Sequence, residues 1–108
     1  MRTKIMLVTV LSLLAGYAVA QEGGKNLKVL QKTWTKSEIK KYMKGVADGL
    51  GVQCDFCHNT DDMSADTPKK ERAREMMTMV MDVNKKLFKG EDRVKCVTCH
   101  NGSQKPKN

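Results

Sequence analysis

One five-residue pattern occurs twice in the sequence and limits the possible folds more than any other feature. Each copy has two cysteines separated by two residues and followed directly by a histidine. The six side chains are Cys54, Cys57, His58, Cys96, Cys99 and His100. This spacing places two thiols one helical turn apart, so that each can form a thioether with a haem vinyl group while the histidine binds the iron. The pattern predicts two covalently bound c-type haems.

The composition indicates a domain that needs such a group. The chain has 108 residues, of which 30% are charged and 5% aromatic. Domains this small usually depend on disulfides, a metal or a cofactor to complete a core. The composition therefore excludes a large catalytic scaffold, and it is consistent with haems that fill the interior.

Three other uses of the cysteines fit part of the pattern. A four-sulfur zinc site would join the two motifs, but 38 residues separate them and such a site requires no histidine after each pair. Two disulfides would suit an exported protein. A thioredoxin-like redox motif would require a βαβ setting that the sequence lacks. Structural zinc binding is kept as an alternative to haem.

The first 20 residues have the pattern of a cleaved export signal. Arg2 and Lys4 precede an apolar run over residues 5–15, and residues 18–20 form a small-x-small cleavage site. The run is short for a membrane span. We therefore predict a signal peptide at residues 1–20, a periplasmic location and no stable membrane span after cleavage.

The remaining chain divides by composition and pattern into three parts. We predict an extended N-terminal segment at residues 21–34, a two-haem domain at residues 35–102 and a flexible C-terminal tail at residues 103–108. The expected fold class is mainly α, a small helical multihaem cytochrome c with two helix–turn–CxxCH units and little or no sheet.

The histidine count restricts the second iron ligand. His58 and His100 are the only histidines in the chain, and both belong to the motifs. The ligand opposite each is therefore methionine, deprotonated lysine, water or none. Methionine is the usual partner in cytochromes c, where it raises the reduction potential.

The sequence before the first motif predicts a helix that carries one such methionine. Thr35 and Glu38 form a capping box, which predicts a helix starting near residue 36. Its apolar face has helical spacing and comprises Ile39, Tyr42, Met43, Val46 and Leu50. Met43 precedes Cys54 by 11 residues. We favour Met43 as the first axial ligand, with core packing as the alternative.

A second helix should precede the second motif. Thr67 followed by Pro68 predicts its start, and it should run to about Phe88. Four of its residues are candidate axial ligands: Met76, Met77, Met79 and Met81. Met76 and Met79 share one flank of the apolar stripe, and the chain that follows is long enough for either to face the second haem.

A family resemblance follows from these segments. Residues 42–59, with Leu-Gly-Val-Gln before the first motif, and residues 73–79 and 96–102, with Ala-Arg-Glu-Met-Met-Thr-Met in the helix, resemble one half of the cytochrome subunit of photosynthetic reaction centres. The resemblance implies Met43 as axial ligand of the first haem. It implies Met76 for the second, with Met79 as the alternative. Members of the reaction-centre type carry four haems in two halves, whereas this chain has two motifs.

These features predict an exported two-haem c-type cytochrome that carries single electrons and is not an enzyme. The alternatives are a haem enzyme or ligand sensor with one open iron site, and a structural zinc-binding protein. The expected partners are redox proteins with acidic docking surfaces, and nucleic acid is not expected. Ten basic residues are expected on helix surfaces, where they form either a docking face or a solvated one: Lys40, Lys41, Lys44, Lys69, Lys70, Arg72, Arg74, Lys85, Lys86 and Lys89.

Overall fold

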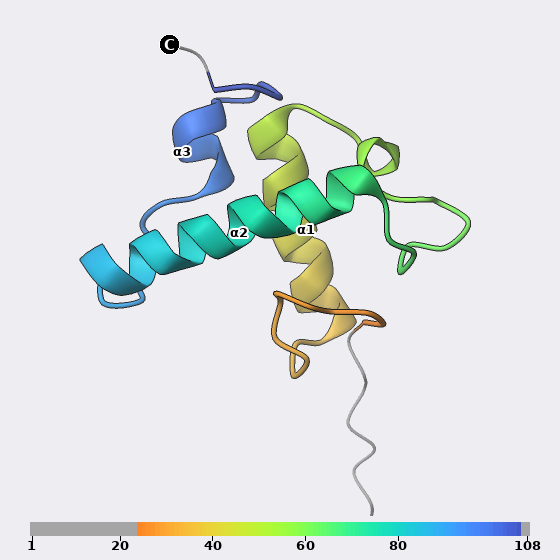
Figure 1. The fold of residues 1–108 in the computed structure, drawn as a ribbon, viewed down its shortest axis with the longest axis horizontal. Helices are drawn as coiled ribbons and strands as arrows, with labels where there is room; N and C mark the ends of the chain where they lie inside the picture. The colour runs from red at the N-terminus through yellow and green to blue at the C-terminus, as the bar shows by residue number, and fades with distance from the viewer. Residues whose placement is uncertain (1–23, 107–108) are drawn as a thin grey trace, which may run out of the picture.

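The computed structural model describes residues 24–106, so the signal peptide predicted at residues 1–20 lies outside the described residues. Four helical elements follow one another along the chain (Figure 1): α1 (Lys36–Leu50), the 3-10 helix η1 (Cys54–Phe56), α2 (Pro68–Leu87) and α3 (Cys96–His100). Extended pairing in the described part is one isolated bridge, between Asn59 and Asp62. The predicted fold class, mainly α with little or no sheet, is confirmed.

Helix α1 begins at the capping box that the sequence predicts and ends at Leu50. The Oγ1 atom of Thr35 accepts from the backbone N–H of Glu38 at 3.3 Å, and the Glu38 carboxylate accepts from the N–H of Thr35 at 2.7 Å. At the other end Gly51 has a φ of 67°, a left-handed conformation that glycine adopts without strain. Its N–H donates to the carbonyls of Ala47 and Asp48 and closes the helix.

Helix α2 is fixed at its start to the first motif. Thr67 is its N-cap, and its hydroxyl oxygen accepts from the N–H of Lys70 at 3.2 Å. The same hydroxyl donates to the carbonyl oxygen of Cys57. The hydrogen bond from the Thr67 hydroxyl therefore attaches the start of α2 to the first motif. Figure 1 shows α2 crossing in front of α1.

The apolar residues of α2 differ in how far the structure buries them. Met77 and Asn84 are buried, with 6% and 7% of their surfaces exposed. Met76, Met79 and Leu87 lie on another side of the helix and are 38%, 50% and 72% exposed. Apolar residues of α2 thus cover a wider arc than the face that the protein buries.

Helix α3 packs against the C-terminal end of α1 (Figure 1). A Cβ atom at Gly49 would lie 2.9 Å from the backbone nitrogen of Val97 and 3.2 Å from the Cβ of Cys96, so glycine permits the contact. The N–H of Gly102 also donates to the carbonyl of Gly49 at 2.8 Å. The fold therefore brings the second motif to the end of the helix that precedes the first.

The apolar core of the polypeptide is very small. Among the described residues, Leu30 and Met77 are the only buried apolar side chains, and none is fully buried. A single aromatic pair, Trp34 and Tyr42, joins the N-terminal segment to α1 with ring centroids 5.5 Å apart. The polypeptide alone provides far less apolar burial than small domains of this length need.

Asn84 is a buried polar side chain that holds the connection between α2 and α3. Its Nδ2 donates to the carbonyl of Val94, and its Oδ1 accepts from the N–H of Val94, both at 2.8 Å. Asn84→Ala is expected to reduce the free energy of unfolding by about 2 kcal/mol, because both backbone groups of Val94 lose their partner. Chemical denaturation measures this loss. The control is Thr78→Ala, at an exposed position of the same helix, which should change the free energy of unfolding by no more than about 0.5 kcal/mol. Equal losses in the two variants would contradict the role of Asn84 in holding this connection.

Candidate haem-binding sites

The first motif forms a tight turn, and three residues separate it from the end of α1. The backbone N–H of His58 donates to the carbonyl of Cys54 at 3.0 Å, which closes the turn. Cys54 is exposed and Cys57 is half-buried. Burial raises the pKa of the Cys57 thiol, and the nearby Lys69 partly opposes this. Both thiols are thus held on one short turn.

The imidazole of His58 is oriented by a backbone carbonyl. Its Nδ1 atom lies 2.8 Å from the carbonyl oxygen of Met63. A carbonyl only accepts, so Nδ1 carries the proton and the lone pair of Nε2 remains for a metal. This is the arrangement that metal-binding histidines usually have.

The second motif forms the five-residue helix α3. Cys96 is half-buried, and burial raises the pKa of its thiol, whereas Cys99 is exposed. The Nδ1 atom of His100 lies 3.0 Å from the carbonyl oxygen of Ser103. Asn101, in a left-handed conformation with φ 51°, turns the chain so that this carbonyl reaches the ring. His100 is therefore oriented in the same way as His58.

The four cysteines remain separate from one another in the described residues. All four thiols are free, so neither motif is a disulfide there. No three cysteine, histidine, aspartate or glutamate side chains of residues 24–106 converge as a metal cluster. The fold does not bring the two motifs together as the four-sulfur zinc alternative requires.

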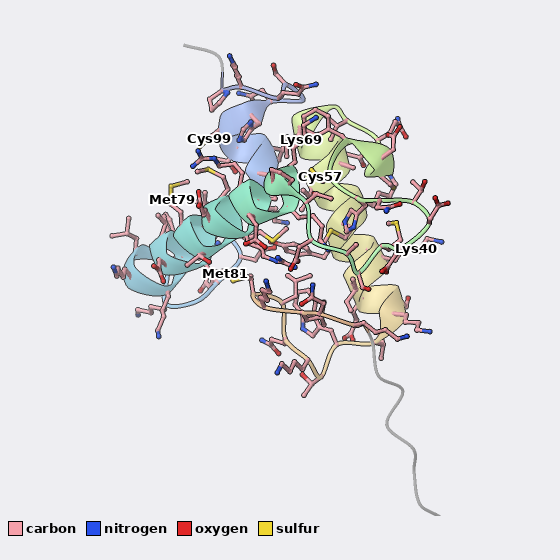
Figure 2. All side chains as sticks on the ribbon, turned by 45° about the vertical axis from the view of Figure 1, so that its right-hand side comes forward. Lys40, Cys57, Lys69, Met79, Met81 and Cys99 are labelled. Carbon is pink, nitrogen blue, oxygen red and sulfur yellow. The ribbon has the colours of Figure 1, made fainter. Side chains whose placement is uncertain are left out.

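The described residues fit haem in a further respect, since a largely apolar surface remains open along α2. A groove of about 570 Å³ runs along α2 and is lined in part by Met79, Val83 and Leu87. Figure 2 shows Met79 projecting from α2 on the side where α3 and Cys99 lie, whereas Met81 projects on the other side. An open apolar surface of this kind is what a porphyrin would cover.

The candidate methionines differ in how far their side chains are exposed. Met43 is half-buried on α1, as the helical pattern predicts. Met77 is buried, which assigns it to packing, whereas Met76 and Met79 are exposed on the open side of α2. Both remain candidates for the second haem.

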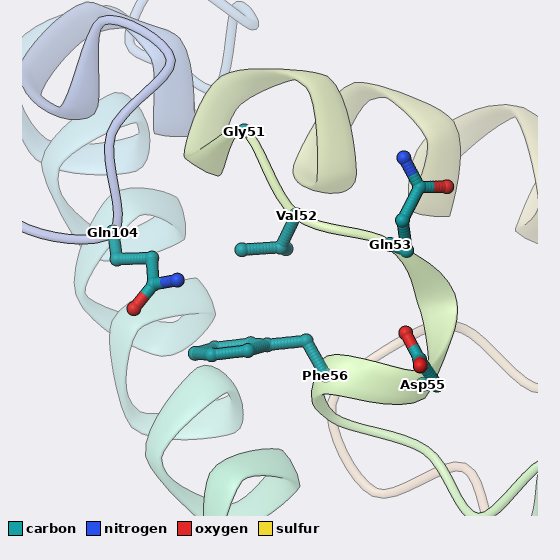
Figure 3. Close-up of a pocket in the computed structure, with 6 residues that line it drawn as sticks. All are labelled: Gly51, Val52, Gln53, Asp55, Phe56 and Gln104. Carbon is teal, nitrogen blue, oxygen red and sulfur yellow. The ribbon is translucent and has the colours of Figure 1, made fainter.

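A small hollow lies between the segments around the two motifs (Figure 3). It has a volume of about 270 Å³ and is lined by Val52 and Phe56 near the first motif and by Gln104 after the second. The Nζ atom of Lys69 lies 3.7 Å from the centre of the Phe56 ring, on its face. The residues between the two cysteines of the first motif thus face the C-terminal segment.

Two of the ten basic residues expected on helix surfaces are largely buried. Lys70 is 9% exposed, and the side chain of Arg74 is 13% exposed. Lys70 precedes the buried Met77 by seven residues, and Asn84 follows Met77 by seven. Residues seven apart lie on the same face of a helix, so this spacing was the signal for burial of Lys70. The expectation failed because lysines are rarely buried.

Arg74 is held by acidic side chains at the start of α2. Its guanidinium contacts the carboxylates of Asp66 and Glu71. Hydrogen bonds from Arg74, Lys28 and Asn26 strongly lower the pKa of Asp66. This cluster joins the N-terminal segment to α2 and leaves Lys70 without those carboxylates as ion-pair partners.

No helix among residues 24–106 has the length and apolar character needed to span a bilayer.

Comparison with known proteins places these motifs in a family. The family model described as "Photosynthetic reaction centre cytochrome C subunit" matches residues 8–108. Cytochrome c-554 of Chloroflexus aurantiacus is 36% identical over 76 residues, which cover 64% of this chain and 18% of that protein. The photosynthetic reaction center cytochrome c subunit of Thermochromatium tepidum is 32% identical over 105 residues, which cover 81% of this chain and 25% of that protein. No solved structure matches the chain.

The chain thus spans about a quarter or less of the length of these two relatives. The family match nevertheless covers both motifs, both long helices and the loops between them. The chain belongs to the family of photosynthetic reaction centre cytochrome c subunits.

Proposed function

We propose that the chain is an exported c-type cytochrome with two haems that carries single electrons between redox proteins. Family membership supports electron transfer and covalent c-type haem in general. The observation that carries the two-haem proposal is the shared geometry of the motifs. In each motif a carbonyl oxygen holds Nδ1 of the histidine, at 2.8 Å in one and 3.0 Å in the other, and two free thiols precede the ring.

Each part of a site has a residue assigned to it in this proposal. The motif cysteines form the thioethers, and His58 and His100 bind iron through Nε2. Met43 is the opposite ligand at the first haem and Met76 at the second, with Met79 as the alternative. When bound, haem supplies a reversible one-electron change of its iron.

Two irons with ligands on both sides leave no position for a substrate. The exposed methionines on α2 are available to complete the second site, and Met43 on α1 is available for the first. A carrier therefore fits the residues better than an enzyme or a sensor, which requires an open iron.

Export through the pattern at residues 1–20 agrees with this proposal. We place the mature protein in the periplasm.

A potentiometric titration of the exported holoprotein tests the carrier proposal. We expect two reversible one-electron steps, and no change in the visible spectrum of the reduced protein when carbon monoxide is added. A spectrum shifted by carbon monoxide in the unaltered protein would instead show an open iron and favour the enzyme or sensor.

The excess of positive charge favours acidic redox partners. Without residues 1–20, which include Arg2 and Lys4, the chain has 18 basic and 12 acidic residues, a formal charge of +6. Oxidation by a small anionic reagent such as ferricyanide should slow several-fold between 10 mM and 500 mM salt, because salt screens the attraction. The rate with a cationic oxidant of similar size should instead rise as the salt concentration increases over the same range. Stopped-flow kinetics measures both, and a rate independent of salt for both reagents would rule out this positive field.

A further inference from the structure

Lys70 is an ammonium group enclosed by backbone carbonyls in the first turn of α2. Only 9% of its surface is exposed. Its Nζ atom donates to the carbonyl oxygens of Met63, Ser64 and Ala65 at 3.2, 3.1 and 2.7 Å. An ammonium has three protons to donate, so these contacts use all of them.

Burial of this ammonium group has a cost in folding free energy. Burying a charge without an ionic partner is unfavourable, and no ion pair within residues 24–106 includes Lys70. The neighbouring Asp66 is occupied by Lys28 and Arg74 instead. Hydrogen bonds from a charged group are stronger than those between neutral groups, so the three bonds offset the burial cost and fix the loop at residues 63–65.

One of these carbonyls is the one that orients the first histidine. The carbonyl oxygen of Met63 lies 3.2 Å from Nζ of Lys70 and 2.8 Å from Nδ1 of His58. A carbonyl oxygen has two lone pairs, and both have a donor here. The carbonyl oxygen of Met63 therefore holds both the imidazole of His58 and the ammonium of Lys70.

The second histidine lacks this partner. His100 is oriented by the carbonyl of Ser103, and that oxygen has no second donor among the described residues. The turn that holds it is attached to α1 through Gly102 and Gly49. The two motifs therefore differ in one charged group beside an otherwise similar hydrogen bond.

We propose that Lys70 is a positioning residue for His58, which fixes the carbonyl that accepts the Nδ1 proton and thereby raises the reduction potential of the first haem above the value it would otherwise have. The ammonium withdraws electron density from the Met63 carbonyl, which weakens its pull on the Nδ1 proton and makes the imidazole a poorer electron donor to iron. A nearby positive charge also favours the reduced, less positive iron. This inference rests on the proposed binding of haem iron by His58.

The test compares holoprotein variants by potentiometric titration. Lys70→Met, which keeps the length but removes the charge and the donors, should lower the potential of one haem by about 59 mV, a tenfold change in its redox equilibrium constant. The potential of the other haem should be unchanged, and Lys70→Arg should retain most of the potential of the unaltered protein. Lys85→Met is the control, since it makes the same change about 22 Å further along α2.

A second measurement does not require a variant that folds. In proton NMR of the unaltered, reduced holoprotein, the Nδ1 proton of His58 should resonate upfield of the Nδ1 proton of His100, because Lys70 weakens the hydrogen bond of the former. A pyridine haemochrome assay of each sample counts the haems. If haem is present on both motifs, an unchanged potential in Lys70→Met, or equal shifts in Lys70→Met and Lys85→Met, overturns the role of Lys70. If Lys70→Met does not fold, equal chemical shifts of the two Nδ1 protons in the unaltered protein overturn it. Absence of haem from the unaltered protein would instead reject the proposed function.

Discussion

Replacing both Cys96 and Cys99 with serine is expected to remove one of two haems and to unfold the second half of the protein. Helix α3 has five residues, too few for stability in isolation, and it depends on its contact with α1. Without the second haem, the exposed stripe of α2 that includes Met79 and Leu87 would have no cover. Burial of each large apolar side chain contributes about 1.5–3 kcal/mol, so the loss should be about 5 kcal/mol. That is comparable to the whole stability of a small domain.

Circular dichroism and a pyridine haemochrome assay together measure this loss. The double variant should contain one haem and less helix than the unaltered protein. Val97→Ser is the matched control, because it changes an exposed side chain of the same helix and leaves both thiols. A double variant with full helix content and unchanged stability would show that the polypeptide does not depend on the second haem.

Met43→Ala is expected to open the iron of the first haem. Loss of the sulfur ligand should lower the potential of that haem by more than about 59 mV, the value for a tenfold change, since methionine favours the reduced iron. The reduced variant should also bind carbon monoxide at one haem. Redox titration and visible spectroscopy measure both changes.

The chain offers a control for this substitution in Met63. Its side chain is 47% exposed, and Met63→Ala retains the backbone carbonyl that orients His58. This variant should keep both potentials. Carbon monoxide binding in Met63→Ala but not in Met43→Ala would exclude Met43 as the ligand.

The same measurement distinguishes Met76 from Met79 at the second haem. Both side chains are exposed on α2, and Figure 2 shows Met79 on the side of α3. The one that binds iron should open the second haem when replaced by alanine, whereas the other should alter stability by about 1 kcal/mol or less.

Local patterns were sufficient to predict the two long helices, α1 and α2. The capping box of Thr35 and Glu38 and the N-cap at Thr67 act over three residues, so the sequence identifies them directly. The end of α1 at Gly51 follows from the same kind of local rule. The histidines and cysteines of the candidate sites could be predicted because thioether attachment requires fixed spacing.

Contacts between distant segments could not be predicted from such patterns. The packing of α3 on α1 depends on the absence of a side chain at Gly49, which faces residues more than 45 positions away. Burial of Lys70 depends on three carbonyls of a loop whose shape no local rule specifies. These contacts arise from tertiary structure, and they distinguish the surroundings of the two motifs.

The packing of α3 on α1 has a consequence for the proposed electron transfer. The carbonyl of Gly49 binds the turn after the second motif, and Cys54 of the first motif follows Gly49 by five residues. The two proposed haems are therefore attached to neighbouring segments of backbone. Such an arrangement suits the passage of an electron from one haem to the other within a single chain.

The mass of the intact exported protein under denaturing conditions tests the central claim most directly. Denaturation removes any group that is not covalently bound, so only thioether-linked haem adds to the mass of the polypeptide. We expect the mass of the polypeptide that starts at Gln21 plus two haem groups. A mass equal to that of the polypeptide alone, with four reactive thiols, would contradict the proposal that both motifs carry haem.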